Sequence, residues 1–239
     1  MARNILSSRI QRKSQLTPTI TEFEIVMQEP VELIFKAGQF MMLNIPPKEG
    51  QKRPTLRAYS ISSDANDKNG FKLLIKLVSG GLGSEFLRSK NEGDELQFTG
   101  PFGKLLFLEP PTSRVVFVCT GAGLSQHMSF LLTHGAKYPQ TKFTMLLGVW
   151  NETEVFYQRE LADLKSKLKN FEFRFVLDKA GPGWAGLTGF VTDHLEKIDY
   201  TNPHSTFYLC GNPAMINSVT EKLKAIAVEP ERILAEAFS

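Results

Sequence analysis

The first half of the chain alternates between hydrophobic and polar residues in short runs, which are separated by Gly, Pro, Asn and Asp. Such alternation is typical of strands that bury one face, and the separating residues favour turns. The pattern predicts an antiparallel β-domain, closed or sandwiched. Its expected strands cover residues 20–27, 39–45, 57–62, 71–78 and 95–98, and a short helix with Ser84 as its N-cap covers residues 84–89.

The second half changes to continuous apolar runs, most of them followed by residues at helical spacing. Strands that alternate with helices indicate a parallel sheet covered on both faces. The last helix is expected to begin with Asn212 as its N-cap and Pro213 at its first position. The expected strands cover residues 114–119, 143–149, 171–177, 206–210 and 233–238, and the helices begin near residues 125, 160 and 213.

A stiff, polar connector, Glu109–Thr112, separates these two patterns. It predicts two domains, residues 1–109 and residues 112–239. A chain of 239 residues is long enough for two such domains. Its hydrophobic content of 42% and charged content of 22% are ordinary for globular proteins and argue against disorder.

Composition also excludes several classes of function. No apolar run approaches the length of a membrane span, and no apolar signal core precedes Arg9. The net charge of +3 is too small to argue for nucleic-acid binding. Two cysteines cannot hold an iron–sulfur cluster, and the four histidines lack metal-ligand spacing. We therefore expect a cytoplasmic protein with no membrane span, no metal and no nucleic-acid partner.

Glycines mark two loops in the second half. Gly121 and Gly123 follow its first strand, and Gly211 follows its fourth. Glycine lets the backbone approach a pyrophosphate, and the next helix begins with free N–H groups. With the strand order 3-2-1-4-5, the two loops flank one crevice at the carboxyl edge of the sheet. Gln126 replaces the third glycine of the dinucleotide fingerprint, so a tight turn without a ligand is the alternative.

A more specific set of motifs runs through both halves. The set comprises Arg57-Ala58-Tyr59-Ser60, Gly80-Gly81-Leu82-Gly83-Ser84, Gly100-Pro101-Phe102-Gly103, Gly121-Ala122-Gly123 and Cys210-Gly211-Asn212-Pro213. In this order, the motifs closely resemble the ferredoxin–NADP reductase superfamily. The resemblance implies a Greek-key antiparallel β-barrel that binds FAD, or FMN, in residues 1–109. It also implies an α/β parallel-sheet, Rossmann-like domain that binds NADH or NADPH in residues 112–239.

The resemblance also implies a flavin site on the first domain. Arg57 is expected to hold a flavin phosphate with its guanidinium group, and Ser60 is expected near the flavin N5. For the arginine motif alone, an ordinary barrel strand with an exposed arginine is the alternative. The expected flavin-binding residues are Arg57, Ala58, Tyr59, Ser60, Gly81, Gly83 and Ser84.

On the second domain, the resemblance implies that Cys210 lies against the nicotinamide and that Glu236 serves proton transfer. Phe238 is expected to cover the flavin. Cys210 as a small buried hydrophobic residue, and Phe238 as a residue filling the domain interface, are the alternatives. Ser60, Cys210 and Glu236 are thus the expected catalytic residues, and the expected nucleotide-binding residues are Gly121, Gly123, Asp178 and Gly211.

Departures from the family pattern bear on nucleotide binding. Ala122 and Gln126 replace Thr and Pro of the family's Gly-Thr-Gly-x-x-Pro loop, which predicts a lower nucleotide affinity. Asp178 stands after the third strand, where NADP-specific relatives often carry Arg. An acidic group favours a free ribose 2′-hydroxyl and repels a 2′-phosphate, so NADH is expected over NADPH. Lys179 could still meet a phosphate.

The resulting hypothesis is a flavoprotein reductase. It transfers a hydride from NADH or NADPH to bound FAD and passes electrons to a separate acceptor, such as a ferredoxin, an oxygenase component or free flavin. A flavin reductase that releases reduced flavin and a flavoprotein subunit without catalysis are the alternatives.

Overall fold

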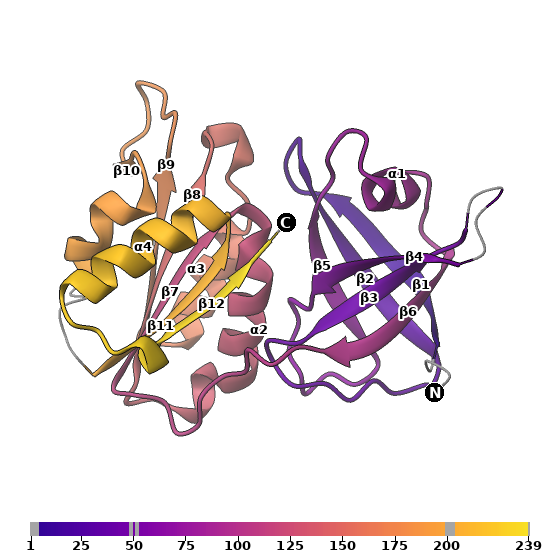
Figure 1. The fold of residues 1–239 in the computed structure, drawn as a ribbon, viewed down its shortest axis with the longest axis horizontal. Helices are drawn as coiled ribbons and strands as arrows, with labels where there is room; N and C mark the ends of the chain where they lie inside the picture. Colours follow the sequence, from indigo (N-terminus) through magenta and orange to yellow (C-terminus); the bar gives the residue numbers. More distant parts are fainter. Residues whose placement is uncertain (1–4, 48–49, 51–52, 199–203, 239) are drawn as a thin grey trace.

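The computed structural model describes residues 5–47, 50, 53–198 and 204–238. It contains two β-sheets side by side, an antiparallel one in the first half and a parallel one in the second (Figure 1), so the predicted fold class is confirmed. The expectation about a signal core falls partly on residues 1–4, which lie outside the described residues. No helix in the described ranges is long and apolar enough to cross a membrane.

The antiparallel sheet has the strand order β4-β3-β6-β1-β2-β5. Just beyond β4, Ile61 forms an antiparallel bridge with Leu73 of β5, which closes the two edge strands into a barrel. Large apolar side chains, among them Phe23, Met41 and Phe98, fill its interior. The strands are β1 (Leu6–Gln15), β2 (Ile20–Glu29), β3 (Phe40–Ile45), β4 (Thr55–Ser60), β5 (Gly70–Lys76) and β6 (Glu95–Phe102).

Strand β1 was not predicted from the sequence. Its inward positions include Leu6, Ser8 and Ile10, and its later residues are largely exposed. The buried Ser8 hydroxyl donates to the Leu96 carbonyl oxygen at 2.9 Å. A polar residue at an inward position broke the alternation on which the prediction depended.

The helix of the barrel, α1 (Leu82–Arg88), begins two residues earlier than predicted. Its N-cap is Gly81, so the predicted N-cap role of Ser84 is wrong. Ser84 lies inside the helix, where its hydroxyl oxygen accepts the Val78 N–H at 2.9 Å. The hydroxyl therefore fixes the incoming loop instead of capping the helix.

The parallel sheet has the strand order β10-β9-β8-β7-β11-β12. Its five predicted strands stand in the order 3-2-1-4-5, which is the order that the hypothesis of two flanking loops required, and the short β10 adds one edge. The strands are β7 (Arg114–Thr120), β8 (Lys142–Val149), β9 (Phe171–Leu177), β10 (Leu187–Thr188), β11 (Ser205–Gly211) and β12 (Ile233–Ala237).

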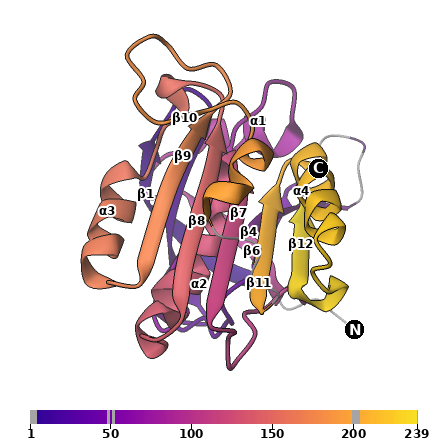
Figure 2. The same ribbon diagram turned by 90° about the vertical axis from the view of Figure 1, so that its left-hand side faces the viewer.

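Helices cover both faces of this sheet, as predicted. Helices α2 and α3 pack on the face toward the barrel, and α4 and η4 pack on the other, which faces the viewer in Figure 2. Asn212 caps α4 by accepting the Ala214 N–H at 2.8 Å, which confirms that prediction. The α-helices are α2 (Leu124–His134), α3 (Gln158–Lys167) and α4 (Pro213–Ala225). The 3₁₀ segments are η1 (Gly121–Gly123), η2 (Gly135–Lys137), η3 (Glu152–Glu154), η4 (Val191–Ile198) and η5 (Pro230–Arg232).

The two halves share a hydrophobic core. Ile20, Ala37 and Leu74 of the barrel half belong to the same buried cluster as Phe117 and Tyr208 of the parallel sheet. Helix α2 lies between the barrel and the sheet, and the C-terminal end reaches the same junction (Figure 1). Burial of apolar surface between the halves therefore favours one relative orientation.

Polar contacts reinforce this junction. The hydroxyls of Thr17 and Thr19 both donate to Glu154 Oε2 at 2.8 Å. The Tyr157 hydroxyl donates to the buried carboxylate of Glu22 on β2. These directional contacts fix the orientation more closely than apolar packing alone.

Candidate functional site

The loops after β7 and β11 touch at the carboxyl edge of the parallel sheet, because β7 and β11 are neighbours in it. The Asn212 N–H donates to Thr120 Oγ1 at 2.9 Å. A Cβ on Gly123 would lie 2.3 Å from the Cys210 carbonyl oxygen. Glycine at position 123 therefore lets the turn that leads into α2 pack directly on the end of β11.

Two other glycines of these loops have backbone conformations that L side chains rarely adopt. Gly121 has a φ of 51° and Gly211 a φ of 124°. No atom of the described residues lies within 4 Å of the place where a Gly121 Cβ would stand, so its backbone faces open space. Helix α2 begins three residues later, and its N-terminus favours an anionic group. This edge suits a pyrophosphate.

Cys210 and Glu236 are neighbours across the sheet. Residue 210 of β11 pairs in register with Cys119 of β7 on one side and with Glu236 of β12 on the other. Cys210 is fully buried, and burial raises the pKa of its thiol, with further contributions from Glu236 and Cys119. The thiol is therefore neutral at physiological pH, and its sulfur is a small apolar group beside the Glu236 carboxylate.

Ser60, at the end of β4 in the barrel, meets Glu236 from the other half. Its side chain hydrogen-bonds to the Glu236 carboxylate, as does that of Gln126 on α2. Burial raises the pKa of Glu236, while both hydrogen bonds act to lower it. The structure thus brings together the three predicted catalytic residues, Ser60, Cys210 and Glu236, at the junction of the halves.

The predicted flavin-binding residues lie around the outer side of β4. Arg57 and Ala58 are exposed, and Tyr59 is partly buried. A Cβ on Gly83 of α1 would lie 2.4 Å from the Tyr59 hydroxyl and 3.1 Å from Arg57 Cγ. Gly83 therefore leaves room for the Arg57 and Tyr59 side chains against α1. Burial raises the pKa of Tyr59, although the Arg57 charge opposes this, so its hydroxyl stays protonated.

The remaining predicted flavin contacts differ in accessibility. Gly81 is partly exposed at the start of α1. Ser84 is only 5% exposed and its hydroxyl is already bonded to Val78, so only its backbone remains for a ligand. Phe238 is partly buried against the shared core, and its N–H donates to the Gly211 carbonyl oxygen at 2.9 Å. This packing agrees with the alternative of an interface residue.

Asp178 stands at the carboxyl end of β9, on the same edge as the glycine loops. Its N–H donates to the Val149 carbonyl oxygen at 3.1 Å, which fixes it next to the end of β8. The Lys179 ammonium group lies 5.8 Å from the ring centre of the exposed Trp150 and 4.0 Å from the Asp178 carboxylate. A carboxylate, an ammonium group and an indole ring therefore stand together at the place expected for the nucleotide's ribose.

The sequence did not predict the role that the structure gives Gln126. Its amide nitrogen donates to the Gly38 carbonyl oxygen at 3.1 Å and to Glu236 Oε2 at 3.2 Å. In the sequence, Gln126 stood out only as a departure from the third glycine of the dinucleotide fingerprint and from the proline of the family loop, and both were interpreted as effects on nucleotide binding. In the structure, Gln126 instead contacts Gly38 of the barrel half and Glu236.

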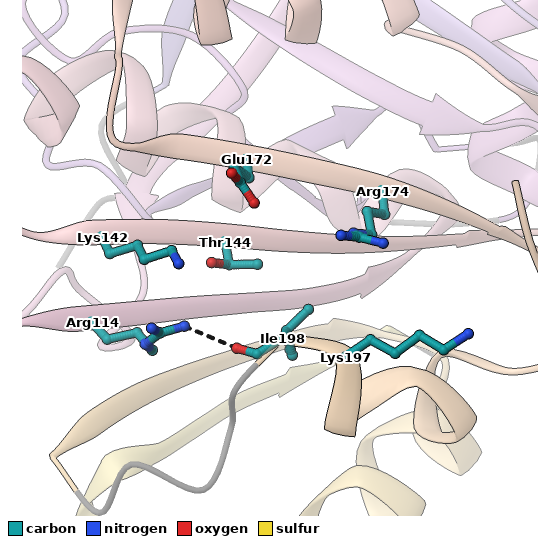
Figure 3. Close-up of a pocket in the computed structure, with 7 residues that line it drawn as sticks. All are labelled: Arg114, Lys142, Thr144, Glu172, Arg174, Lys197 and Ile198. Atoms are coloured by element: carbon teal, nitrogen blue, oxygen red, sulfur yellow. Dashed lines mark hydrogen bonds between the residues drawn. The ribbon is translucent and has the colours of Figure 1, made fainter.

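A separate small pocket lies on the α4 side of the parallel sheet, toward the amino ends of its strands (Figure 3). Arg114 there donates to the Ile198 carbonyl oxygen at 2.9 Å. The pocket is lined by Arg114, Lys142, Thr144, Glu172, Arg174, Lys197 and Ile198. It lies at the opposite strand ends from the glycine loops and does not belong to the candidate site.

Comparison with protein families gives a match in each half. The model of the oxidoreductase FAD-binding domain matches residues 7–107. The model of the oxidoreductase NAD-binding domain matches residues 117–221. Together the two matches include two of the three predicted catalytic residues, Ser60 and Cys210, whereas β12 and Glu236 lie beyond residue 221.

Two relatives illustrate the range of similar proteins. The anthranilate 1,2-dioxygenase electron transfer component of Acinetobacter baylyi is 30% identical over 212 residues, which cover 88% of this chain and 60% of that protein. Ferredoxin–NADP reductase B of Sorangium cellulosum is 28% identical over 222 residues, which cover 90% of this chain and 89% of that protein. This chain thus spans less than two thirds of the Acinetobacter protein but most of the Sorangium protein.

A similar solved structure is that of a ferredoxin–NADP⁺ reductase from Neisseria gonorrhoeae with bound FAD and NADP. The TM-score is 0.83 at 25% sequence identity, and the match covers 99% of each chain. The arrangement of barrel and parallel sheet is therefore shared over the whole length of both chains.

Proposed function

Because the chain belongs to the ferredoxin–NADP reductase superfamily, we propose that it is a reductase that transfers a hydride from NADH to bound FAD and passes the electrons to an acceptor outside these 239 residues. The family matches identify an FAD-binding domain followed by an NAD-binding domain. We assign residues 1–109 to the first and residues 112–239 to the second.

The residues around β4 and α1 fit FAD. Arg57 is exposed and offers a guanidinium group to a phosphate, and Tyr59 offers a ring beside it. The close approach of Gly83 to both side chains leaves no room for a larger residue there. When bound, FAD supplies the group that accepts the hydride and can release electrons singly or in pairs.

The observation that carries the proposal is that Glu236 meets the barrel half. The Gln126 amide joins its carboxylate, at 3.2 Å, to the Gly38 carbonyl oxygen of the barrel, at 3.1 Å, and the Ser60 side chain of the barrel acts to lower its pKa. The barrel provides a hydroxyl, and the last strand of the parallel sheet provides a carboxylate. Glu236 can hold or release a proton at its carboxylate, and Ser60 can donate its hydroxyl proton to a neighbouring acceptor. Cys210, in register beside Glu236, is neutral and has no exposed surface in this structure, so a nicotinamide ring can meet it only after the residues that cover it move aside.

The junction also restricts water. Cys119, Cys210 and Phe117 are fully buried beneath it, and Gln126 is fully buried beside it. Exclusion of water strengthens the hydrogen bonds that orient Glu236 and limits side reactions of a reduced cofactor.

The preference for NADH rests on Asp178. Its carboxylate can accept the hydrogen bond of a ribose 2′-hydroxyl and repels a 2′-phosphate. The Lys179 ammonium group lies over the Trp150 ring, so part of its charge interacts with the indole ring.

The acceptor is proposed to be a separate ferredoxin-like protein or oxygenase component. The Acinetobacter relative is an electron transfer component of a dioxygenase, which supports this class of acceptor. The two cysteines of this chain cannot bind an iron–sulfur cluster, so a one-electron centre of that kind must be supplied from outside these residues.

An absorbance spectrum of the desalted protein, before and after anaerobic NADH or NADPH, tests the proposal. Flavin bands that bleach faster with NADH than with NADPH are expected. Bands that bleach with NADPH alone would overturn the assignment of Asp178 and leave the reaction intact. A colourless protein that reduces added flavin would favour the alternative of a flavin reductase that releases reduced flavin. A protein with neither colour nor turnover would favour the alternative of a flavoprotein subunit without catalysis.

A further inference from the structure

Gln126 is a buried amide with both of its donors engaged. It is the third residue of α2 and has no exposed surface. Its Nε2 donates to Gly38 at 3.1 Å and to Glu236 at 3.2 Å. Because both partners are acceptors, only the nitrogen can face them, which fixes the orientation of the amide. Among the described residues, its buried Oε1 has no hydrogen-bond partner, so the amide is held through its nitrogen alone.

The Gly38 partner is a rigid point of the barrel half. Gly38 has a φ of 95°, and a Cβ there would lie 2.3 Å from the Leu105 carbonyl oxygen and 2.7 Å from a Phe130 ring carbon. The backbone at Gly38 is therefore held between the 103–107 segment and α2. Its carbonyl oxygen is a fixed anchor for the Gln126 amide.

The Glu236 carboxylate is consequently held from two directions. Ser60 reaches it from β4 of the barrel and Gln126 from α2 of the second half. Cys210, in register with Glu236 on β11, is the ionisable side chain beside it. A long side chain near the end of a terminal strand has several rotamers in solution, and two hydrogen bonds select one of them.

We propose that Gln126 is a positioning residue for the hydride-transfer site, which holds the Glu236 carboxylate against Ser60 and ties it to the barrel through Gly38. This inference rests on the proposed function of the site. On this interpretation, the glutamine that replaces the family's proline at position 126 orients the Glu236 carboxylate and does not weaken nucleotide binding.

The same contact acts on the ionisation of Glu236. N–H donation favours the carboxylate form, so the Gln126 hydrogen bond lowers the pKa of Glu236 while burial raises it. Loss of this donor should therefore raise the pKa of Glu236 further.

The variant Gln126→Met tests the proposal, because methionine has a similar length and no donor. Full-length, FAD-loaded protein with ¹³C-labelled glutamate carboxyl groups is titrated by NMR, and Glu236→Gln identifies the Glu236 signal. The midpoint of Glu236 should rise in Gln126→Met. It should stay unchanged in Ser129→Ala, which removes another buried polar group of α2. Gln126→Asn, whose amide is too short to reach both partners, should change the midpoint in the same direction. This variant replaces Gln126→Met in the experiment if the methionine variant does not fold.

The rate of flavin reduction by NADH, measured by stopped flow as a function of pH, is a second readout. The pH profile of this rate should move with the Glu236 midpoint in Gln126→Met and stay in place in Ser129→Ala. An unchanged midpoint and an unchanged profile in both Gln126 variants would overturn the positioning role, even if NADH reduces the flavin normally. A shifted midpoint in a protein that NADH does not reduce would instead contradict the proposed function and leave the contact of Gln126 with Glu236 established.

Discussion

At the residue scale, the proposed flavin site requires a residue without a side chain at position 83. Gly83 approaches the Tyr59 hydroxyl so closely that a Cβ would lie 2.4 Å from it. Tyr59 Oη is the far end of a side chain and can move without disturbing the barrel. Substitution at residue 83 therefore tests the position of Tyr59 separately from the stability of the fold.

In the variant Gly83→Ala, the new Cβ displaces the Tyr59 ring. We expect FAD to bind about tenfold more weakly, with little change in melting temperature. Fluorescence titration of the apoprotein with FAD measures the affinity. Gly183→Ala, whose new Cβ would have no neighbour within 4 Å in the part of the chain that the structure describes, should bind FAD as the parent does. Equal affinities of both variants would remove Tyr59 from the flavin site.

The choice of nucleotide also belongs to single residues. Asp178→Arg replaces the group that repels a 2′-phosphate with one that attracts it, so kcat/KM for NADPH relative to NADH should rise by about tenfold or more. Steady-state reduction of an artificial acceptor gives both values. Asp163→Arg changes the charge equally at an exposed position of α3 and should leave the ratio unchanged. A constant ratio in Asp178→Arg would exclude Asp178 from nucleotide selection.

At the scale of elements, the site depends on the junction of two strand ends. The turn before α2 and the end of β11 are in backbone contact at Gly123, and the Thr120 hydroxyl bonds to the Asn212 N–H. Both loops must keep this packing for Gly121 to face open space and for Cys210 to stay beside Glu236. The packing involves main-chain atoms, which cannot move as a side chain does.

For this reason Gly123→Ala should be costly. Its Cβ would lie 2.3 Å from the Cys210 carbonyl oxygen, so we expect a loss of about 1–3 kcal/mol in the free energy of unfolding. The KM for NADH should also rise, because the loops separate. Gly135→Ala, at the other end of α2, meets the movable Leu168 side chain at 2.5 Å and should affect stability less and KM hardly at all. Urea unfolding and steady-state kinetics compare the two, and similar effects would contradict the role of the loop contact.

At the scale of the whole molecule, function requires that the two halves keep one orientation, because Ser60 and Glu236 come from different halves. A shared hydrophobic core joins the halves. Directional bonds at Glu154 and Glu22 add specificity to it. Of these, the bond from Tyr157 to Glu22 is the more deeply buried, since Glu22 is 7% exposed.

The variant Tyr157→Phe leaves the buried Glu22 carboxylate without one donor. Lys72 remains 3.9 Å away and compensates only in part, so we expect a loss of about 1–3 kcal/mol in the free energy of unfolding. Tyr138→Phe is the matched control, because the Tyr138 hydroxyl donates to Glu109, whose side chain is 46% exposed. There the expected loss is below about 1 kcal/mol. Urea denaturation measures both, and a loss in Tyr157→Phe no larger than in Tyr138→Phe would refute the stated contribution of the interface bond.

The sequence by itself determined the features that depend on neighbouring residues. Continuous apolar runs followed by helical spacing gave the order of strands and helices in the second half, because period and turn residues are local properties. Asn212 was identified as a cap from its place before Pro213, and the structure has that bond. The same local method failed at β1, whose inward Ser8 is satisfied by a partner on β6 that the local pattern cannot show.

Only the tertiary structure decided how the site is assembled. Ser60, Gln126 and Glu236 belong to three different elements, and no periodicity relates them. They meet because the barrel packs on α2 and because β12 lies beside β11, with its end at the junction. Gln126 shows the difference most clearly. In the sequence it is a departure from a motif, whereas in the fold its two N–H donors have two acceptors supplied by distant parts of the chain. Local preferences determine where helices and strands form. Long-range packing determines which polar side chains are buried next to one another.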